Sequence, residues 1–228
     1  MQLKVLSWNI WDEGHFDEIA QFLKSSEADI IGLQEVLPFS KNIPIIEFLT
    51  SLGYKHVYAP ARLSSGEREE MGNAVFSKYP IVSNAVHVLS EENKRIAVQA
   101  DIAVEGKIVY VFSVHLLHTH QQSSGIQELQ AENLLKVLPQ ERVIVMGDFN
   151  AIPESVAVQK MRSVLTDTDT TSAPTWSVYP EGCPVCNPQK IDIRLDYIFV
   201  SSDIKTITST VEVSNGSDHL PISAIIEM

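Results

Sequence analysis

The sequence lacks several features that define specialised classes of protein. Its 228 residues include only two cysteines, Cys183 and Cys186, which excludes a disulfide-dense scaffold and fits a reducing compartment. No stretch approaches the roughly 18–20 consecutive apolar residues that a membrane span needs. The first residues show no charged segment followed by an apolar one, so no secretory signal is predicted. We therefore expect a cytoplasmic chain without a membrane span.

Basic residues are also scarce, because 17 Lys and Arg face 29 Asp and Glu and leave a formal net charge of −12. An acidic chain repels polyanions at long range, and proteins that grip duplex DNA usually carry basic patches. The charge therefore argues against an extended grip on long DNA. It does not argue against a local phosphate site, since a bound metal ion inverts the charge of its pocket.

Short apolar runs rich in Val and Ile recur along the chain, a pattern typical of buried strands. Several runs border a polar residue that can carry chemistry, namely Asn9, Glu35, His115, Asp148 and Asp196. Residues 96–104 alternate between apolar and polar instead, which predicts a half-covered strand leading into a hairpin turn at Glu105-Gly106. Apolar residues at helical spacing predict helices within residues 16–23, 44–52 and 131–138.

This mixture of elements predicts an α/β fold, a two-sheet β-sandwich flanked by helices, with a single doubly wound sheet as the alternative. No internal repeat, low-complexity tract or linker-like change of composition interrupts residues 1–228, so one domain is expected. Residues 165–190 are rich in Thr, Ser, Pro, Asp and Gly and are expected to form a long ordered loop near the site.

Five ordered blocks resemble the motifs of the endonuclease/exonuclease/phosphatase (DNase I-like) superfamily. They are Ser7-Trp8-Asn9-Ile10, Leu33-Gln34-Glu35-Val36, Ser113-Val114-His115-Leu116, Gly147-Asp148-Phe149-Asn150 and Ser217-Asp218-His219-Leu220-Pro221. Residues 194–199, and residues 72–77 followed by Pro80-Ile81, resemble two further blocks of that superfamily. The blocks together span residues 7–221. The resemblance implies a four-layer α/β/β/α fold and Mg²⁺-dependent hydrolysis of phosphoesters, with Mn²⁺ able to substitute.

The resemblance implies metal ligands at Asn9, Glu35 and Asp218. Glu35 would be the main ligand, and this choice suits Mg²⁺, which prefers hard oxygen donors and retains several waters. Some relatives carry an aspartate two residues after the first asparagine. Here that position is Trp11, and Asp12 comes one residue too late to be assigned.

The resemblance also implies catalytic roles at five positions. Asp148 would orient and deprotonate the attacking water, while Asn150 and His115 would bind phosphate oxygens. His219 would donate a hydrogen bond to the phosphoryl oxygens. Asp196 would pair with His219, as carboxylates do with catalytic histidines, and so fix its tautomer and favour its charged form.

Substrate contacts are expected at Asn73, His118 and Trp176, and Glu70 would be the carboxylate partner of His115. Trp8 and Trp11 are expected to pack rather than to bind substrate, and Tyr179 is the alternative to Trp176 as an aromatic contact for the substrate.

Two short motifs raise the question of zinc. His118 and His120 follow His115 closely, but the spacing is not that of a zinc-binding helix and no glutamate accompanies it. Cys183-Pro-Val-Cys186 resembles half a structural zinc site, yet no second cysteine pair exists. Solvated histidines and a tight loop with two thiols are therefore the interpretation that we favour, with zinc or a functional disulfide as the alternative.

The resemblance implies a metal-dependent phosphoester hydrolase, and a monomer is expected although the sequence does not determine the oligomeric state. A nuclease, a tyrosyl-DNA-type phosphodiesterase and a phosphatase or phospholipase remain open, and a non-catalytic phosphate-binding module on the same fold is the alternative from another class. The acidic charge favours small or single-stranded phosphoesters over long duplex DNA. A basic rim assembled from distant residues would reverse that preference; the candidates are Arg62, Arg68, Lys78 and Arg95.

Overall fold

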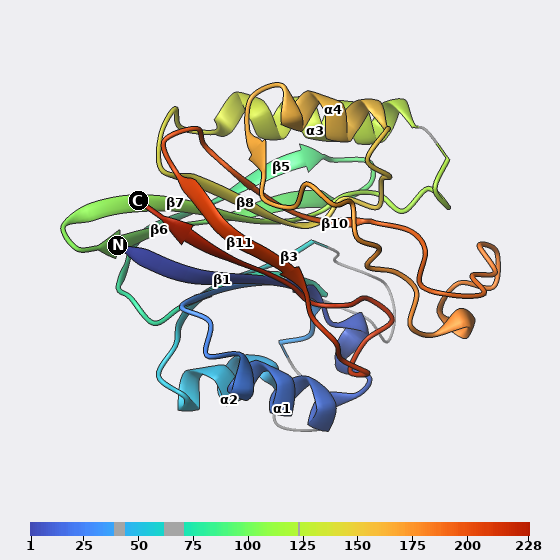
Figure 1. The fold of residues 1–228 in the computed structure, drawn as a ribbon, viewed down its shortest axis with the longest axis horizontal. Helices are drawn as coiled ribbons and strands as arrows, with labels where there is room; N and C mark the ends of the chain where they lie inside the picture. Colours follow the sequence, from blue (N-terminus) through green and yellow to red (C-terminus); the bar gives the residue numbers. More distant parts are fainter. Residues whose placement is uncertain (39–43, 62–70, 123) are drawn as a thin grey trace.

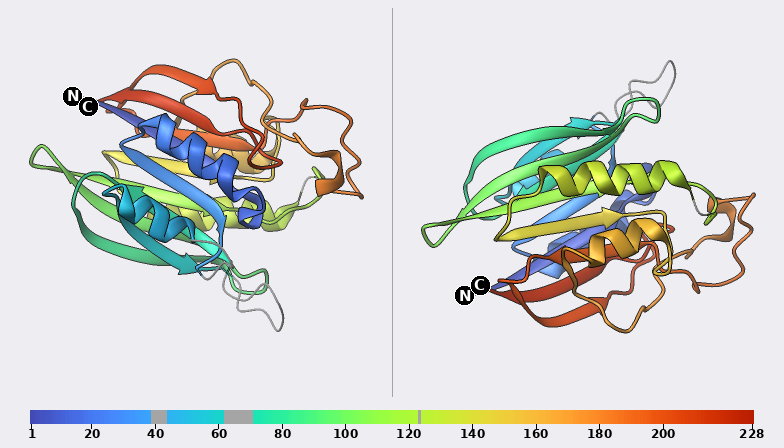
Figure 2. Two further views of the ribbon diagram at one scale, coloured as in Figure 1. Left: turned by 90° about the horizontal axis from the view of Figure 1, so that it is seen from below. Right: turned by 90° about the horizontal axis from the view of Figure 1, so that it is seen from above.

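The computed structural model describes residues 1–38, 44–61, 71–122 and 124–228. Over these residues the chain forms two six-stranded sheets that stack face to face between two pairs of helices (Figures 1 and 2). The predicted two-sheet sandwich is therefore confirmed, and the single doubly wound sheet was the wrong alternative. None of the helices in the described ranges is long and apolar enough to cross a membrane.

The first sheet contains both ends of the chain. Its strands are, in spatial order, β11 (Lys205–Val211), β12 (Ile222–Glu227), β1 (Gln2–Asn9), β2 (Ile30–Val36), β4 (Gly72–Ser77) and β3 (Lys55–Pro60). Helices α1 (Phe16–Ser26) and α2 (Ile45–Ser51) cover its outer face, as the left view of Figure 2 shows. The apolar stripe predicted for residues 16–23 faces this sheet, with Ile19 and Leu23 fully buried.

The second sheet consists of β5 (Ile81–Ser90), β6 (Arg95–Val104), β7 (Lys107–His115), β8 (Val143–Asp148), β10 (Asp196–Val200) and β9 (Thr166–Asp167). Helices α3 (Gly125–Val137) and α4 (Val156–Arg162) cover its outer face (Figure 2, right). Both helices begin at a serine whose hydroxyl accepts a backbone N–H, Ser124 for α3 and Ser155 for α4. The hairpin predicted at Glu105-Gly106 joins β6 to β7, and both of its residues have positive φ.

The main apolar core lies between the sheets, where side chains from both inner faces interdigitate. Strands β1, β2, β8 and β10 are also covered by helices or loops on their outer faces, so nearly all of their residues are buried. This double coverage explains why the sequence shows continuous apolar runs there instead of alternation. It also gives the residues at the ends of these strands a rigid support.

Strand direction brings the predicted site residues to one edge of the sandwich. β1 runs parallel to β2, and β7 runs parallel to β8, where His115 pairs with Asp148. β10 is antiparallel to β8, so its first residue, Asp196, also lies beside Asp148. A side chain at Gly147 would overlap the carbonyl group of Val114, and its φ is 155°. Only glycine therefore allows β8 to lie this close to β7 just before Asp148.

Candidate active site

A cavity of about 340 Å³ opens at this edge, between the two sheets and the loop that precedes β10. Most of the polar residues that the sequence singled out line it. The lining residues are Asn9, Trp11, Asp12, Glu35, Met71, Arg95, His115, His118, His120, Asp148, Asn150, Trp176, Cys183, Pro184, Val185, Asp218 and His219.

The carboxylate of Asp148 is the centre of this arrangement. Its Oδ2 accepts hydrogen bonds from the amide nitrogens of Asn9 and Asn150, each at 3.1 Å. The same oxygen lies 3.5 Å from Nε2 of His115 and 3.6 Å from Nε2 of His219. Burial raises the pKa of Asp148 to about 6, and the charge of Asp196 adds to this effect, while His219 opposes it. One buried carboxylate therefore lies beside two imidazoles and is able to exchange a proton near neutral pH.

His219 is held in one orientation by a second carboxylate. Its Nδ1 donates to Oδ2 of Asp196 at 2.9 Å, and the hydroxyl of Thr175 donates to the same oxygen at 2.6 Å. Burial alone would lower the pKa of His219, but the carboxylates of Asp196, Asp148 and Asp218 outweigh it and raise that pKa well above the usual value. These carboxylates therefore favour the charged form of His219, whose Nε2 is directed toward Asp148 and the cavity.

Asn150 follows Asp148 by two residues and is fixed by hydrogen bonds of both its backbone and its side chain. Its backbone N–H donates to Oδ1 of Asp148 at 2.7 Å, and its amide nitrogen donates to Oδ2 of Asp148 and to the carbonyl of Leu116 at 3.2 Å. The amide oxygen faces Nδ1 of His118 at 2.8 Å. The left-handed backbone at Asn150, with φ of 49°, turns its side chain into the cavity.

The opposite wall of the cavity is acidic. Burial, followed by the charges of Asp12 and Asp218, raises the pKa of Glu35 to about 7. Asn9 donates its amide nitrogen to Oε1 of Glu35 at 3.2 Å, while its amide oxygen accepts the backbone N–H of Trp11 at 3.1 Å. A divalent cation such as Mg²⁺ fits this wall, because it prefers hard oxygen donors and its charge would offset the repulsion among the carboxylates. In this arrangement Asn9 supports the two carboxylates through its amide nitrogen.

A second group of potential metal ligands consists of Asp148, Asp196 and His219, whose ligand atoms lie within 4.8 Å of one another. However, Nδ1 of His219 is already bonded to Asp196, and Mg²⁺ prefers oxygen to imidazole nitrogen. The geometry therefore suits acid–base chemistry at this group and metal binding at the acidic wall.

The remaining residues that the sequence singled out lie in different places. His118 lines the cavity, and burial lowers its pKa. Trp176 lines it as well but is only 2% exposed, and its indole N–H donates to Oδ2 of Asp218 at 3.0 Å, so it supports that carboxylate. Asn73 is buried in β4, donates to the carbonyl of Ile96 at 3.1 Å and is not among the described lining residues. Glu70 lies outside the described residues.

Two residues that sequence reasoning did not assign belong to this cavity. Trp11, Asp12 and Glu13 have left-handed backbone angles, with φ of 47°, 56° and 60°, and Asp12 lines the cavity. Three consecutive left-handed residues without glycine have no reliable sequence signature. Trp11 packs, since its ring stacks on Tyr179 at a centroid distance of 5.5 Å, and it also forms part of the cavity wall. Trp8, in contrast, is fully buried, as predicted.

The raised pKa values predict an unusual pH dependence for the metal-free chain. The folded state retains protons on Glu35, Asp148 and His219 that the unfolded chain releases. The free energy of unfolding is therefore highest in mild acid, and it decreases by about 1–3 kcal/mol as the pH rises from about 5 to 8. Urea denaturation at several pH values in a chelator measures this.

Glu35→Gln is expected to flatten this pH profile, and Glu18→Gln, an exposed position on α1, is the matched control. A free energy of unfolding that rises between pH 5 and pH 8 in the wild-type chain would contradict the assigned proton positions.

Comparison with known proteins places the chain in a family. The sequence profile of the endonuclease/exonuclease/phosphatase family matches residues 6–219, whereas no curated protein sequence matches the chain. Among solved structures, an endonuclease/exonuclease/phosphatase from Bacteroides vulgatus is similar with a TM-score of 0.79 and 20% identity, covering 100% of this chain and 99% of that one.

Two other similar structures have names that indicate more. A mannosyl-6-phosphatase from Bacteroides thetaiotaomicron has a TM-score of 0.73 and 19% identity, with coverage of 99% and 100%. Truncated TDP2 from Caenorhabditis elegans has a TM-score of 0.72 and 21% identity, with coverage of 100% and 98%. These similarities show a shared fold, and the profile match over nearly the whole sequence shows that the chain belongs to the endonuclease/exonuclease/phosphatase family.

Proposed function

We propose that this chain is a divalent-metal-dependent phosphoester hydrolase. The observation that carries the proposal is the position of Asp148, whose carboxylate is bonded to Asn9 and Asn150 and faces the imidazolium of His219 in one cavity. Phosphoester hydrolysis needs charge neutralisation, an activated water and donors to the phosphoryl oxygens. Each of these has a candidate group within the same cavity.

The metal would be held by Glu35 with Asp218 and Asp12 around it, and Mg²⁺ fits these oxygen donors best, with Mn²⁺ able to replace it. When bound, it would neutralise phosphate charge and polarise a phosphoryl oxygen. Its positive charge would also lower the raised pKa of Glu35, because the ionised carboxylate would then have a partner.

The protein groups would carry the proton transfers. Asp148, once ionised, orients a water molecule and removes its proton, because its pKa of about 6 places the base near neutral pH. Nε2–H of His219 donates to the phosphoryl oxygens as their charge increases, and Asp196 keeps that imidazole charged and oriented. His115 would complete the phosphate contacts, and the amide nitrogen of Asn150, whose two N–H groups donate to Asp148 and Leu116 here, would join them by exchanging one of these partners for phosphate.

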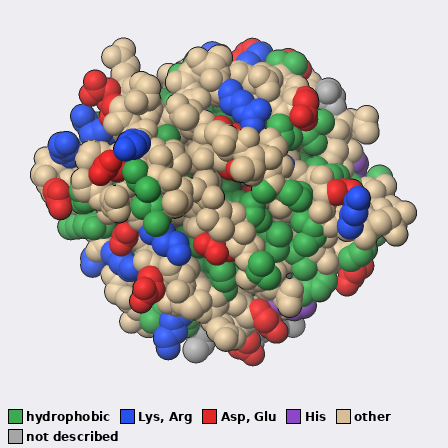
Figure 3. All heavy atoms as spheres, in the orientation of Figure 1, with side chains coloured by type: hydrophobic (Ala, Val, Ile, Leu, Met, Phe, Trp, Pro, Cys, Tyr) green, Lys and Arg blue, Asp and Glu red, His purple; other side chains and the backbone are tan. Residues whose placement is uncertain are grey.

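The charges around the cavity favour a small or single-stranded phosphoester as the substrate. Arg95 is the one Lys or Arg among the described lining residues, whereas the carboxylates of Asp12, Glu35 and Asp218 form the acidic wall. Lys78, one candidate for a basic rim, directly follows the last residue of β4 and forms an ion pair with Asp29 at 3.7 Å. Two other candidates, Arg62 and Arg68, lie outside the described residues. On the face that Figure 3 shows, Lys and Arg are interspersed with Asp and Glu.

A panel of phosphoesters tests this preference. We expect bis-p-nitrophenyl phosphate, single-stranded oligonucleotides and short phosphoesters to be hydrolysed with higher kcat/KM than long duplex DNA. Duplex binding should be weak with a shallow salt dependence, because each phosphate contact contributes about −0.9 to the slope of log K against log salt. Nanomolar duplex affinity with a slope steeper than about −5 would refute the preference. Phosphate binding without turnover of any panel member would instead favour the non-catalytic module.

A further inference from the structure

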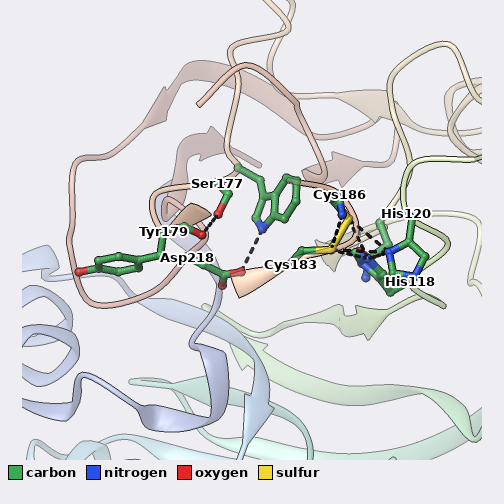
Figure 4. The surroundings of a disulfide bond; sticks show 9 residues. His118, His120, Ser177, Tyr179, Cys183, Cys186 and Asp218 are labelled. Carbon is green, nitrogen blue, oxygen red and sulfur yellow. Dashed lines mark hydrogen bonds between the residues drawn. A yellow bond between two sulfur atoms is a disulfide. The ribbon is translucent and has the colours of Figure 1, made fainter. Parts of the chain in front are cut away.

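A cluster of two histidines and two cysteines lies at the rim of the cavity, outside the groups that the proposed reaction uses. His118 and His120 follow β7, and Cys183 and Cys186 come from the loop before β10 (Figure 4). In this structure the two sulfurs form a disulfide, and both imidazole rings face it. We propose that the reduced chain binds one zinc ion at these four residues, as a closed structural site.

The distances fit tetrahedral zinc. Bonds of about 2.3 Å to sulfur and 2.0–2.1 Å to nitrogen place a sulfur and a nitrogen about 3.6 Å apart in a tetrahedral site. Here Cys183 Sγ lies 3.8 Å from Nε2 of His118 and 3.6 Å from Nδ1 of His120. Cys186 Sγ lies 3.5 Å and 3.2 Å from the same two nitrogens, which are 3.1 Å apart. The rings therefore need little movement, and the sulfurs must separate to about 3.8 Å after reduction.

The hydrogen bonds of Asn150 give His118 the tautomer that zinc needs. The amide nitrogen of Asn150 already donates to Leu116 and to Asp148, so its amide oxygen must accept from Nδ1–H of His118 at 2.8 Å. The proton is therefore on Nδ1, and the lone pair of Nε2 faces the sulfurs. Metal-binding histidines commonly have this kind of support behind them, which fixes the ring and its basicity.

The cysteine loop has the local structure of a thiolate site. The backbone N–H of Cys186 donates to Sγ of Cys183 at 3.2 Å, and the N–H of Asn187 donates to the carbonyl of Cys183 at 2.9 Å. This turn places both sulfurs on the same side, with Cα atoms 5.3 Å apart. A hydrogen bond from a backbone N–H to sulfur stabilises the thiolate, which is the form that binds zinc. Two cysteines separated by two residues also match the ligand spacing of structural zinc sites.

A zinc ion at this site would stabilise a long loop that has little other support. The segment between β9 and β10, residues 168–195, contains only the short 3₁₀ helix η2 (Pro180–Gly182) and a few isolated bridges. Its apolar support is small and consists mainly of Trp176, Cys183 and Leu195. Because such long loops are uncommon without a constraint, a metal that ties this loop to the segment after β7 would hold one wall of the cavity in place.

Reduction followed by zinc binding converts the disulfide form of the chain into the zinc-bound form. A dithiol reductant transfers two electrons and two protons to the disulfide, becomes a cyclic disulfide itself and leaves two thiols on the chain. Binding of Zn²⁺ then releases the two thiol protons to solvent, and two thiolates with two neutral imidazoles form an electrically neutral centre. All four positions are protein ligands, so this zinc would leave no open position for substrate.

The experiment measures metal content. The full chain is purified with a dithiol reductant, supplied with ZnSO₄, freed of excess metal by gel filtration and analysed for zinc. We expect about one zinc per chain, and we expect Cys186→Ser and His120→Ala each to lower that content at least tenfold. His56→Ala, an exposed histidine on β3, and Glu35→Gln should retain the zinc. Retention by Glu35→Gln separates this site from the proposed catalytic metal.

A second measurement does not depend on the folding of variants. The reduced wild-type chain loaded with Co²⁺ should show thiolate-to-cobalt charge transfer and the intense visible bands of a tetrahedral S₂N₂ site. The proposal is overturned if the reduced chain retains less than a tenth of an equivalent of zinc, or if Cys186→Ser and His120→Ala retain zinc as the wild type does. A Co²⁺ spectrum without thiolate charge transfer would overturn it as well.

Discussion

Asp148→Asn is expected to lower kcat by about 10²–10⁴-fold, the usual contribution of a positioned general base. The amide has nearly the same shape as the carboxylate but only one acceptor oxygen, so it can keep the contact with the backbone N–H of Asn150 or the contact with Asn9, and it does not accept a proton from water. His219→Ala removes the charged donor and should reduce kcat by about 10²–10³-fold. The double variant should be less impaired than the product of the two effects, because both groups act on one transition state.

Steady-state kinetics with bis-p-nitrophenyl phosphate measures these effects, and circular dichroism reports whether each variant is folded. Asp17→Asn, at an exposed position on α1, is the matched control for the change of carboxylate to amide. His56→Ala is the corresponding control for loss of a histidine. A folded Asp148→Asn chain with the kcat of the wild type would show that another group activates the water.

Removal of divalent metal is expected to abolish turnover, and Mg²⁺ or Mn²⁺ should restore it. The side chain of Glu35 is 19% exposed and lines the cavity, so an ion can reach it. Glu35→Gln should weaken Mg²⁺ binding by about 10–100-fold or more, since even residues behind the ligands have effects of that size.

Isothermal titration with Mg²⁺ and activity in excess EDTA measure these two effects. Glu18→Gln provides the control for a glutamate outside the cavity. Full turnover by metal-stripped protein in EDTA would exclude a metal-dependent mechanism. Unchanged Mg²⁺ affinity in Glu35→Gln would instead place the ion elsewhere, for example at the group formed by Asp148, Asp196 and His219.

The sheets and the centre of the site could be predicted because local patterns and strand topology determine them. Asn9, His115, Asp148 and Asp196 each lie at the end of a buried strand, where an apolar run meets a polar residue. Parallel pairing of β7 with β8 and antiparallel pairing of β8 with β10 then bring three of these residues together without any contribution from loops.

Features built by loops could not be predicted in the same way. Asp12 comes one position later than the expected aspartate, and only a left-handed turn brings it to the cavity. Trp11 meets Tyr179 across a separation that no local pattern reports. Neither His118-Thr-His120 nor Cys183-Pro-Val-Cys186 offers four zinc ligands by itself, and the proposed site joins two halves that lie 63 residues or more apart.

In the proposed reaction this cavity hydrolyses phosphoesters with water activated at Asp148. The most direct test is the release of p-nitrophenol from bis-p-nitrophenyl phosphate by wild-type and Asp148→Asn chains purified in parallel and assayed with saturating Mg²⁺. We expect steady turnover by the wild-type chain and a rate at least about 100-fold lower for the folded variant. Equal rates in the two samples, or no turnover by the wild-type chain across the phosphoester panel, would contradict it.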